Sequence, residues 1–277
     1  MGYSEGSRTP TSIELGCADP NFGCRLPNSM AGDPALKQVV SKSWEAGLRG
    51  KLSPQTQWNL GVFRGDNTDE ILFVANSAAT GFFKNFGKTR RQGLELGLSS
   101  SVERLRVRFD YTYLQASYQS QDSLNGEFNS GADADGFIGV QPGDRMPLIP
   151  QQIFKARADY QFLPHLSIGL NMIAIGSSFV RGNENNSHEP DGFSSFGSGS
   201  VPGYAVFGLS ANYKPGKQLK LFANISNLFN REYMSAGQLR PFAITPTGGY
   251  SNSDTLSTTF YAPGAPRSLS IGARYEF

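Results

Sequence analysis

The sequence predicts an all-β protein, an antiparallel transmembrane β-barrel with about ten strands in the chain. Three observations predict this fold. Apolar residues recur at every second position over segments longer than the strands of most soluble proteins. Tight turns alternate with long polar loops along the chain. No stretch reaches the roughly 18 consecutive apolar residues that a membrane-spanning helix needs.

The predicted strands run from the first residues to the last. They are a stub before Ser7 and the ranges 39–52, 56–75, 82–100, 105–118, 149–162, 166–181, 201–213, 218–232 and 265–277. The apolar positions of the clearest segments are, in chain order, Trp44, Ala46 and Leu48; Leu105, Val107, Phe109, Tyr111 and Tyr113; Phe154, Ala156, Ala158, Tyr160 and Phe162; Leu219, Leu221, Ala223 and Ile225; and Leu269, Ile271, Ala273, Tyr275 and Phe277. Polar residues such as Arg106, Asp159 and Lys220 occupy the positions between them. Each strand therefore has one apolar and one polar face.

The connections support a barrel whose strands pair with their neighbours as hairpins. Tight turns are predicted at 53–55, 102–104, 163–165 and 214–217, and long polar loops at 7–38, 119–147, 182–200 and 234–263, with a shorter one near 76–81. Short turns at one end and long loops at the other are typical of a transmembrane barrel. A soluble β-sandwich is the alternative. The strand lengths, and charges such as Arg106 and Lys155 opposite the apolar face, favour a barrel with a water-filled interior.

The composition excludes two other classes of protein. The 277 residues contain 25 Lys and Arg against 23 Asp and Glu, and 12% of them are aromatic. Disordered chains are poor in aromatic residues and strongly charged. A balanced charge provides no basic block for a phosphate backbone, so we expect no nucleic-acid partner.

The first residues and the cysteines bear on the compartment. Residues 1–8 lack the features of a secretory signal, which predicts either a cytosolic protein or a chain whose beginning is missing. Cys17 and Cys24 could form a disulfide across a short loop, which favours an oxidising compartment; two free thiols are the alternative. The two histidines, His165 and His188, are remote in sequence from that pair, so no zinc site is expected.

The last eight residues resemble the β-signal of bacterial outer-membrane proteins. Ser270 supplies the polar position, Gly272 the glycine, Tyr275 the aromatic position and Phe277 the terminal aromatic residue. The resemblance implies that the barrel-assembly machinery recognises this strand. It also implies that the protein is located in the lipid bilayer of the bacterial outer membrane.

Further motifs resemble those of TonB-dependent receptors, the ligand-gated transporters of the outer membrane. They lie at residues 3–11, 89–95, 143–150, 227–233 and 263–267. Such receptors have a barrel of about 22 strands, an N-terminal plug domain inside it, and a segment that contacts TonB. The resemblance implies that residues 1–277 are the C-terminal portion of such a barrel, with Met1 inside a strand and with the plug domain and TonB box absent.

The same resemblance implies energy-coupled uptake of a scarce ligand, such as a ferric siderophore, cobalamin or a glycan, with the plug domain and TonB as partners and without enzymatic activity or a cofactor. Cationic and aromatic loop residues are the candidates for ligand binding, because guanidinium groups suit an anionic chelate and aromatic rings suit a glycan. The principal candidates are Arg145, Arg181, Phe193, Arg240 and Tyr250. Phe137, Phe196, Phe242 and Tyr261 are further candidates.

An alternative is a self-contained ten-stranded outer-membrane barrel that acts as a protease or an adhesin. No catalytic constellation and no metal site is predicted. Asp133 and Asp135 resemble a fragment of a calcium loop, but the other ligands are missing, so they are expected to be solvated carboxylates. His188, beside Glu189, is expected to be an exposed loop residue without a special role.

Overall fold

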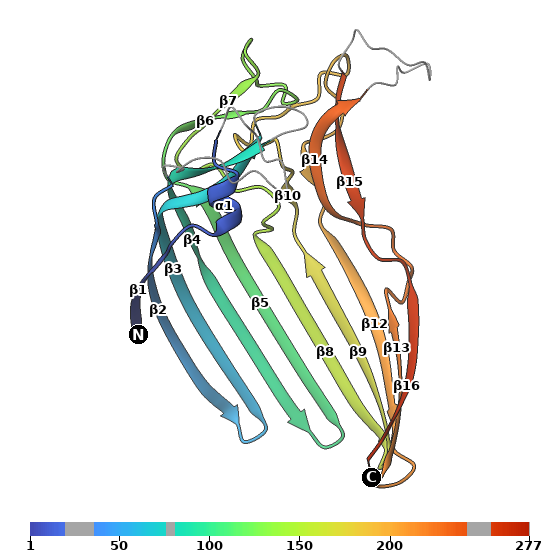
Figure 1. The fold of residues 1–277 in the computed structure, drawn as a ribbon. Helices are drawn as coiled ribbons and strands as arrows, with labels where there is room; N and C mark the ends of the chain where they lie inside the picture. The colour runs from blue at the N-terminus through green and yellow to red at the C-terminus, as the bar shows by residue number, and fades with distance from the viewer. Residues whose placement is uncertain (20–35, 76–80, 243–255, 277) are drawn as a thin grey trace.

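The computed structural model describes residues 1–19, 36–75, 81–242 and 256–276. Its main feature is one curved antiparallel sheet of ten strands in the order β1-β2-β3-β4-β5-β8-β9-β12-β13-β16 (Figure 1). Their bounds are β1 Gly2–Arg8, β2 Val39–Ser53, β3 Thr56–Ala75, β4 Gly81–Val102, β5 Leu105–Tyr118, β8 Gln152–Leu163, β9 Leu166–Ile175, β12 Tyr204–Tyr213, β13 Leu219–Ser226 and β16 Ser268–Tyr275. The predicted number of strands and their hairpin connectivity are confirmed.

The four predicted tight turns all lie at one end of the sheet, at the bottom of Figure 1. Between β4 and β5, Glu103 takes a positive φ of 50°, which a two-residue hairpin requires. The long loops lie at the other end. The described residues that join β5 to β8, β9 to β12 and β13 to β16 are called the cap below.

One apolar face continues through all ten strands, because the register pairs apolar residues with apolar residues. Leu96 pairs with Leu60 on one side and Tyr111 on the other, and Ile225 pairs with Leu209 and Leu269. Exposed side chains on this face include Trp44, Leu48, Val62, Leu96, Phe109, Tyr160, Ile168, Leu170, Leu221, Leu269 and Ile271. So large an exposed apolar surface suits contact with lipid.

The opposite face is polar and carries ion pairs along single strands. Arg108 binds Asp110 at 2.8 Å, and Arg157 binds Asp159 at 2.6 Å. Residues two apart in a strand lie on the same face, so both pairs project from the polar side of the sheet. The predicted division into an apolar and a polar face is confirmed.

The ten strands do not close into a barrel by themselves. Among the described residues, β1 pairs only with β2, and β16 pairs only with β13, so both outer edges of the sheet are open. The alternative of a self-contained ten-stranded barrel is therefore wrong, since lipid requires every backbone group of a spanning sheet to be paired.

Two strands end earlier than predicted, and each for a local reason. β9 ends at Ile175 rather than 181, because residues 178–179 pair with 200–201 outside the main sheet. β13 ends at Ser226 rather than 232, because Asn227 takes a φ of 48°. The Asn227 amide donates to the carbonyl oxygens of Arg231 (2.8 Å) and Ala265 (3.0 Å). The motif at 227–233 is thus a turn that ties β13 to the segment before β16.

The cap contains short elements where only polar loops are predicted. They are β6 Asp122–Asn125, β7 Phe137–Val140, β10 Ser178–Phe179, β11 Ser200–Val201, β14 Met234–Phe242 and β15 Leu256–Pro263. The helix α1 Ser12–Gly16 lies beside the start of β4. No described helix has the length and apolar character to cross a membrane. The fully buried apolar side chains Phe86, Ile138, Val140 and Val180 all lie at this end of the molecule. The hydrophobic core therefore sits under the loops and holds them in place.

Of the two cysteines predicted to form a disulfide, the structure describes only Cys17. Cys17 is buried beside α1, and its carbonyl oxygen accepts a hydrogen bond of 2.7 Å from the backbone of Phe83. Cys24 lies outside the described residues, as do Tyr250 and Phe277. The Cys17–Cys24 bond therefore stays a prediction.

Candidate ligand-binding site

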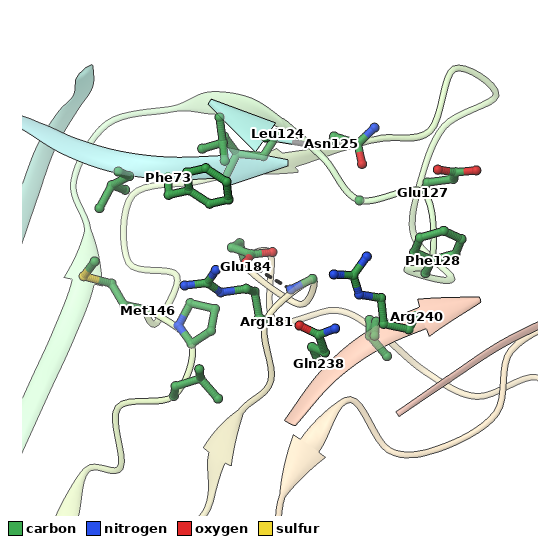
Figure 2. A pocket seen from close by; sticks show the side chains of 18 of the residues that line it. Phe73, Leu124, Asn125, Glu127, Phe128, Met146, Arg181, Glu184, Gln238 and Arg240 are labelled. Atoms are coloured by element: carbon green, nitrogen blue, oxygen red, sulfur yellow. Dashed lines mark hydrogen bonds between the residues drawn. The ribbon is translucent and has the colours of Figure 1, made fainter. Parts of the chain in front are cut away.

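A cavity of about 310 Å³ opens at the cap, where several separate parts of the chain meet. Its lining comes from the end of β3, the first residue of β4, residues 118 and 124–128, residues 146–148, residues 181, 182 and 184, and residues 238–240. Figure 2 shows the charged side chains of Arg181, Glu184 and Arg240 grouped between the apolar walls. A partly apolar cavity with a few convergent polar groups is the usual form of a small-molecule site.

Backbone pairing fixes the two arginines relative to each other. The N–H group of Arg181 donates to the Gly237 carbonyl oxygen (3.1 Å), and that of Leu239 donates to the Arg181 carbonyl oxygen (2.8 Å). These bonds align the segment after β10 with β14, in parallel, with Arg181 opposite Gln238. Arg240 lies on β14, two residues after Gln238. Both arginine side chains therefore project from the same pair of hydrogen-bonded segments.

Apolar side chains line the other sides of the cavity. Phe73 comes from β3, Leu124 from β6, Phe128 from the loop after it, and Met146 from the segment before β8 (Figure 2). Met146 also belongs to the buried cluster with Phe86 and Tyr118. The walls are therefore an extension of the core of the cap, which keeps their positions fixed.

Glu184 is the unusual group of this cavity. Its Oε1 atom accepts a hydrogen bond of 3.0 Å from the backbone of Gly182. Its Oε2 atom is buried and has no hydrogen-bond partner in the described part of the protein. Burial raises the pKa of the Glu184 carboxyl above its ordinary value, while the Gly182 N–H group and the Arg181 charge act in the opposite direction. The buried Oε2 atom thus favours the protonated form.

A buried polar network holds this part of the loop against the neighbouring loop. The side-chain amide of Asn129 donates to the Gly182 carbonyl oxygen (2.9 Å), and Nδ1 of His188 accepts from the backbone N–H of Ser130 (3.1 Å). Asn183 donates to the carbonyl oxygen of Gly199 (3.0 Å). All three side chains are buried, so each bond replaces one that water would otherwise make.

His188 corrects an expectation from the sequence. It was expected to be exposed, but only 6% of its surface is accessible. Burial lowers its pKa, which favours the neutral imidazole that accepts from Ser130. Asp133, in contrast, acts as an ordinary turn carboxylate, since its Oδ1 atom accepts from the backbone of Asp135 (3.0 Å) and Phe137 (2.8 Å).

The structure brings two of the five principal candidates into one site. Arg181 and Arg240 line the cavity. Arg145 lies nearby without lining it, stacked over the Phe179 ring at 5.0 Å and bonded through its backbone to the side chain of Asn186. Phe193 is 86% exposed on a turn outside the cavity lining.

Of the further candidates, Phe137, Phe196 and Tyr261 are not part of the cavity lining either. Phe137 is exposed, Phe196 is half-buried, and the Tyr261 hydroxyl donates to the Ser200 carbonyl oxygen (3.0 Å). The side chain of Phe242 is not described. Sequence reasoning missed Glu184, Gln238, Phe73 and Phe128. Nothing in the local sequence around these four distinguishes them from other loop and strand residues, because only the packing of the cap brings them together.

Glu184 gives a pH-dependent prediction. Because its folded-state pKa is raised, the stability that its neutral form contributes is complete below the ordinary pKa of 4.5 and decreases as the pH rises towards the folded-state pKa. Glu184→Gln stays neutral and keeps an oxygen acceptor for Gly182. In the full-length protein we therefore expect the cap of Glu184→Gln to resist limited proteolysis better than the wild-type cap at neutral pH, and equally well at acidic pH.

At each pH the cleavage rate of the Glu184→Gln variant is divided by that of the wild type, which removes the pH dependence of the protease itself. Glu189→Gln, which neutralises an exposed carboxyl group in the same loop, is the matched control and should follow the wild type at every pH. A ratio for Glu184→Gln that does not change with pH would contradict the inferred burial of the carboxyl group.

Comparisons with known proteins all indicate the same protein family. The model of the family described as TonB dependent receptor-like, beta-barrel, matches residues 1–228. The probable TonB-dependent siderophore receptor PiuA of Acinetobacter baumannii is 27% identical over 246 residues, which cover 87% of this chain and 29% of the relative. The probable TonB-dependent receptor BfrD of Bordetella pertussis is 30% identical over 201 residues, 72% of this chain and 24% of the relative.

Solved structures share the fold. The copper transporter OprC superposes with a TM-score of 0.65 at 18% identity, over 99% of this chain and 36% of that protein. The siderophore receptor PiuA of Acinetobacter baumannii superposes with a TM-score of 0.61 at 17% identity, over 99% of this chain and 33% of that protein. The chain therefore spans between 24% and 36% of the length of these relatives.

Proposed function

The chain belongs to the TonB-dependent receptor family, and from this we propose that it is the C-terminal part of the barrel of an outer-membrane receptor that takes up a scarce ligand with energy delivered through TonB. The observation that carries this proposal is the cavity in the cap. It lies at the long-loop end of a sheet whose apolar face suits lipid, and two arginines face its interior.

The rest of the receptor follows from the same proposal. The remaining strands would pair with the open edges of β1 and β16 and close the barrel. The plug domain would cover the polar face, and the plug and TonB would act as partners in the full-length protein. The barrel-assembly machinery would recognise the last strand through Ser270, Gly272, Tyr275 and Phe277.

We propose a ferric siderophore as the ligand. Guanidinium groups form short, charge-assisted hydrogen bonds with anionic oxygen ligands, and their planar shape fits paired oxygen atoms. Phe73, Phe128 and Met146 offer apolar contacts to the organic part of a chelate. A neutral Glu184 would not repel an anion. The relative PiuA is named a probable siderophore receptor, which agrees with this chemistry.

Uptake of radiolabelled iron by cells that produce the full-length receptor tests this proposal. Two probes are offered separately, the ferric complex of a catecholate siderophore and that of a hydroxamate siderophore. We expect iron to accumulate from at least one of them in cells that contain TonB, and only at background level in otherwise identical cells without TonB. Equal accumulation in both strains, or none from either probe, would overturn the proposal.

A further inference from the structure

A group of charged side chains lies on the apolar face of the sheet, directly beyond the apolar residues and towards the cap. The register fixes this position. On the apolar face of β3, Val62 is the last apolar residue towards the cap. Arg64 is the next residue on that face and pairs with Trp44 of β2. One step further, Asp66 stands between Lys42 on β2 and Arg90 on β4.

Aromatic side chains mark the level of this group. Trp44 pairs with Tyr3 on the apolar face, and their ring centroids are 5.3 Å apart. Both residues are exposed, Tyr3 to 56% and Trp44 to 44%. Trp and Tyr concentrate where a bilayer changes from acyl chains to headgroups. The row of Arg64 is therefore at the boundary, and the row of Lys42, Asp66 and Arg90 lies about 7 Å beyond it, at the depth of the headgroups.

The charges of the group do not cancel. Asp66 accepts from Arg64 at 2.8 Å and from Arg90 at 2.6 Å, so one carboxylate is shared by two guanidinium groups. Lys42 lies 3.7 Å from Glu5. Lys88, opposite Thr68, adds a further cation in the next row. Four cations thus face two anions, and each arginine keeps N–H donors that Asp66 does not use.

The cations of the group lie on neighbouring strands. On β2, β3 and β4 the boundary rows hold Lys42, Arg64 and Arg90. On the next two strands of the sheet, β5 and β8, the residues beyond the apolar positions on the same face are Gln115 and Gln152. Cations on three adjacent strands can contact one and the same anionic neighbour.

We propose that Lys42, Arg64, Lys88 and Arg90 bind the phosphate groups of a lipid in the outer leaflet. A lipid is the occupant that the structure favours, because the charged group continues directly from the apolar face that lipid would cover. Paired arginines suit a phosphate better than lysines alone, since each guanidinium offers two parallel donors. This inference rests on the proposed function in one respect, which is the location of the sheet in an outer membrane.

The test uses the purified full-length receptor and lipid A with two phosphate groups, incorporated in nanodiscs of phosphatidylcholine. Arg64→Gln with Arg90→Gln removes two positive charges, and a basic residue near an anionic lipid surface contributes about a fivefold change in affinity. We therefore expect lipid A to bind the double variant on the order of twentyfold more weakly, with little binding of dephosphorylated lipid A by either protein. Free inorganic phosphate should not compete, because the acyl chains also contribute.

Arg108→Gln with Arg157→Gln is the matched control. It removes two arginines that are also paired with an aspartate, from the opposite face of the same sheet. This control should bind lipid A as the wild type does. Arg64→Lys with Arg90→Lys retains the charge and should lose less affinity than the glutamine variant. Heat-dependent mobility in gel electrophoresis verifies that each barrel has folded.

Equal binding of lipid A by the wild type and the Arg64→Gln, Arg90→Gln variant would overturn the inference, as would equal loss in the control variant. Competition by inorganic phosphate would reassign the site to a free anion. Iron uptake, measured in parallel, separates the two proposals. An absence of lipid A binding with intact uptake contradicts only the lipid site, whereas lipid A binding without uptake contradicts only the transport function.

Discussion

Reversal of both cavity charges, Arg181→Glu together with Arg240→Glu, is expected to weaken the binding of a ferric siderophore by the full-length receptor at least a hundredfold. A hydrogen bond to a charged group contributes roughly 1.5 to 3 kcal/mol, so loss of two such contacts alone corresponds to a factor on the order of 10² to 10⁴. The new carboxylates also repel an anionic chelate. Quenching of protein fluorescence by the ferric complex measures the affinity.

The matched control reverses two arginines that do not line the cavity. Arg231 and Arg267 are both exposed. Arg231 lies near the start of the connection between β13 and β16, and Arg267 lies at its end. Arg231→Glu with Arg267→Glu changes the net charge by the same amount and should bind the chelate as the wild type does. Equal weakening in both variants would show a general effect of charge, and an unchanged affinity in the cavity variant would exclude the cavity as the ligand site.

Deletion of Phe277 is the second prediction with a large effect. We expect the full-length receptor without this residue to fall at least tenfold in outer-membrane abundance and to be degraded in the periplasm. The last strand would then lack the terminal aromatic residue through which the barrel-assembly machinery is expected to recognise it. In the described residues β16 pairs only with β13. Its other edge needs a further strand of the barrel as its partner, and that pairing forms when the barrel is assembled.

Immunoblots of separated membranes measure this effect, with Arg274→Gln as the control because residue 274 is not a defining position of the signal. Normal outer-membrane levels after deletion of Phe277 would contradict the assignment of the C-terminal residues. Accumulation of the deletion variant in a strain that lacks periplasmic proteases would agree with it.

The main sheet could be predicted from the sequence because its physical cause is local. One face of each strand is apolar and the other is polar, and this leaves a period of two in the sequence itself. The turns carry their own signals, such as Pro54 and Pro164. The early end of β13 could not be predicted, because it depends on bonds from Asn227 to Arg231 and to the distant Ala265.

The cap depends on contacts between segments far apart in the chain. β6 and β7 form a short hairpin whose Ile138 and Val140 are buried against Phe86 of β4, and no periodic pattern records that packing. The same holds for the cavity. Arg181 and Arg240 could be selected one by one as loop cations, but their common site depends on the pairing of residue 181 with residues 237 and 239. Glu184 and His188 became notable only once their burial was known.

The position of iron in the full-length receptor tests the central claim most directly. Crystals of the receptor with a ferric siderophore, measured at the iron absorption edge, give an anomalous peak at the metal. We predict that this peak lies in the cavity of the cap, with the chelate between Arg181 and Arg240. A peak elsewhere in the receptor, with this cavity empty, would contradict the account.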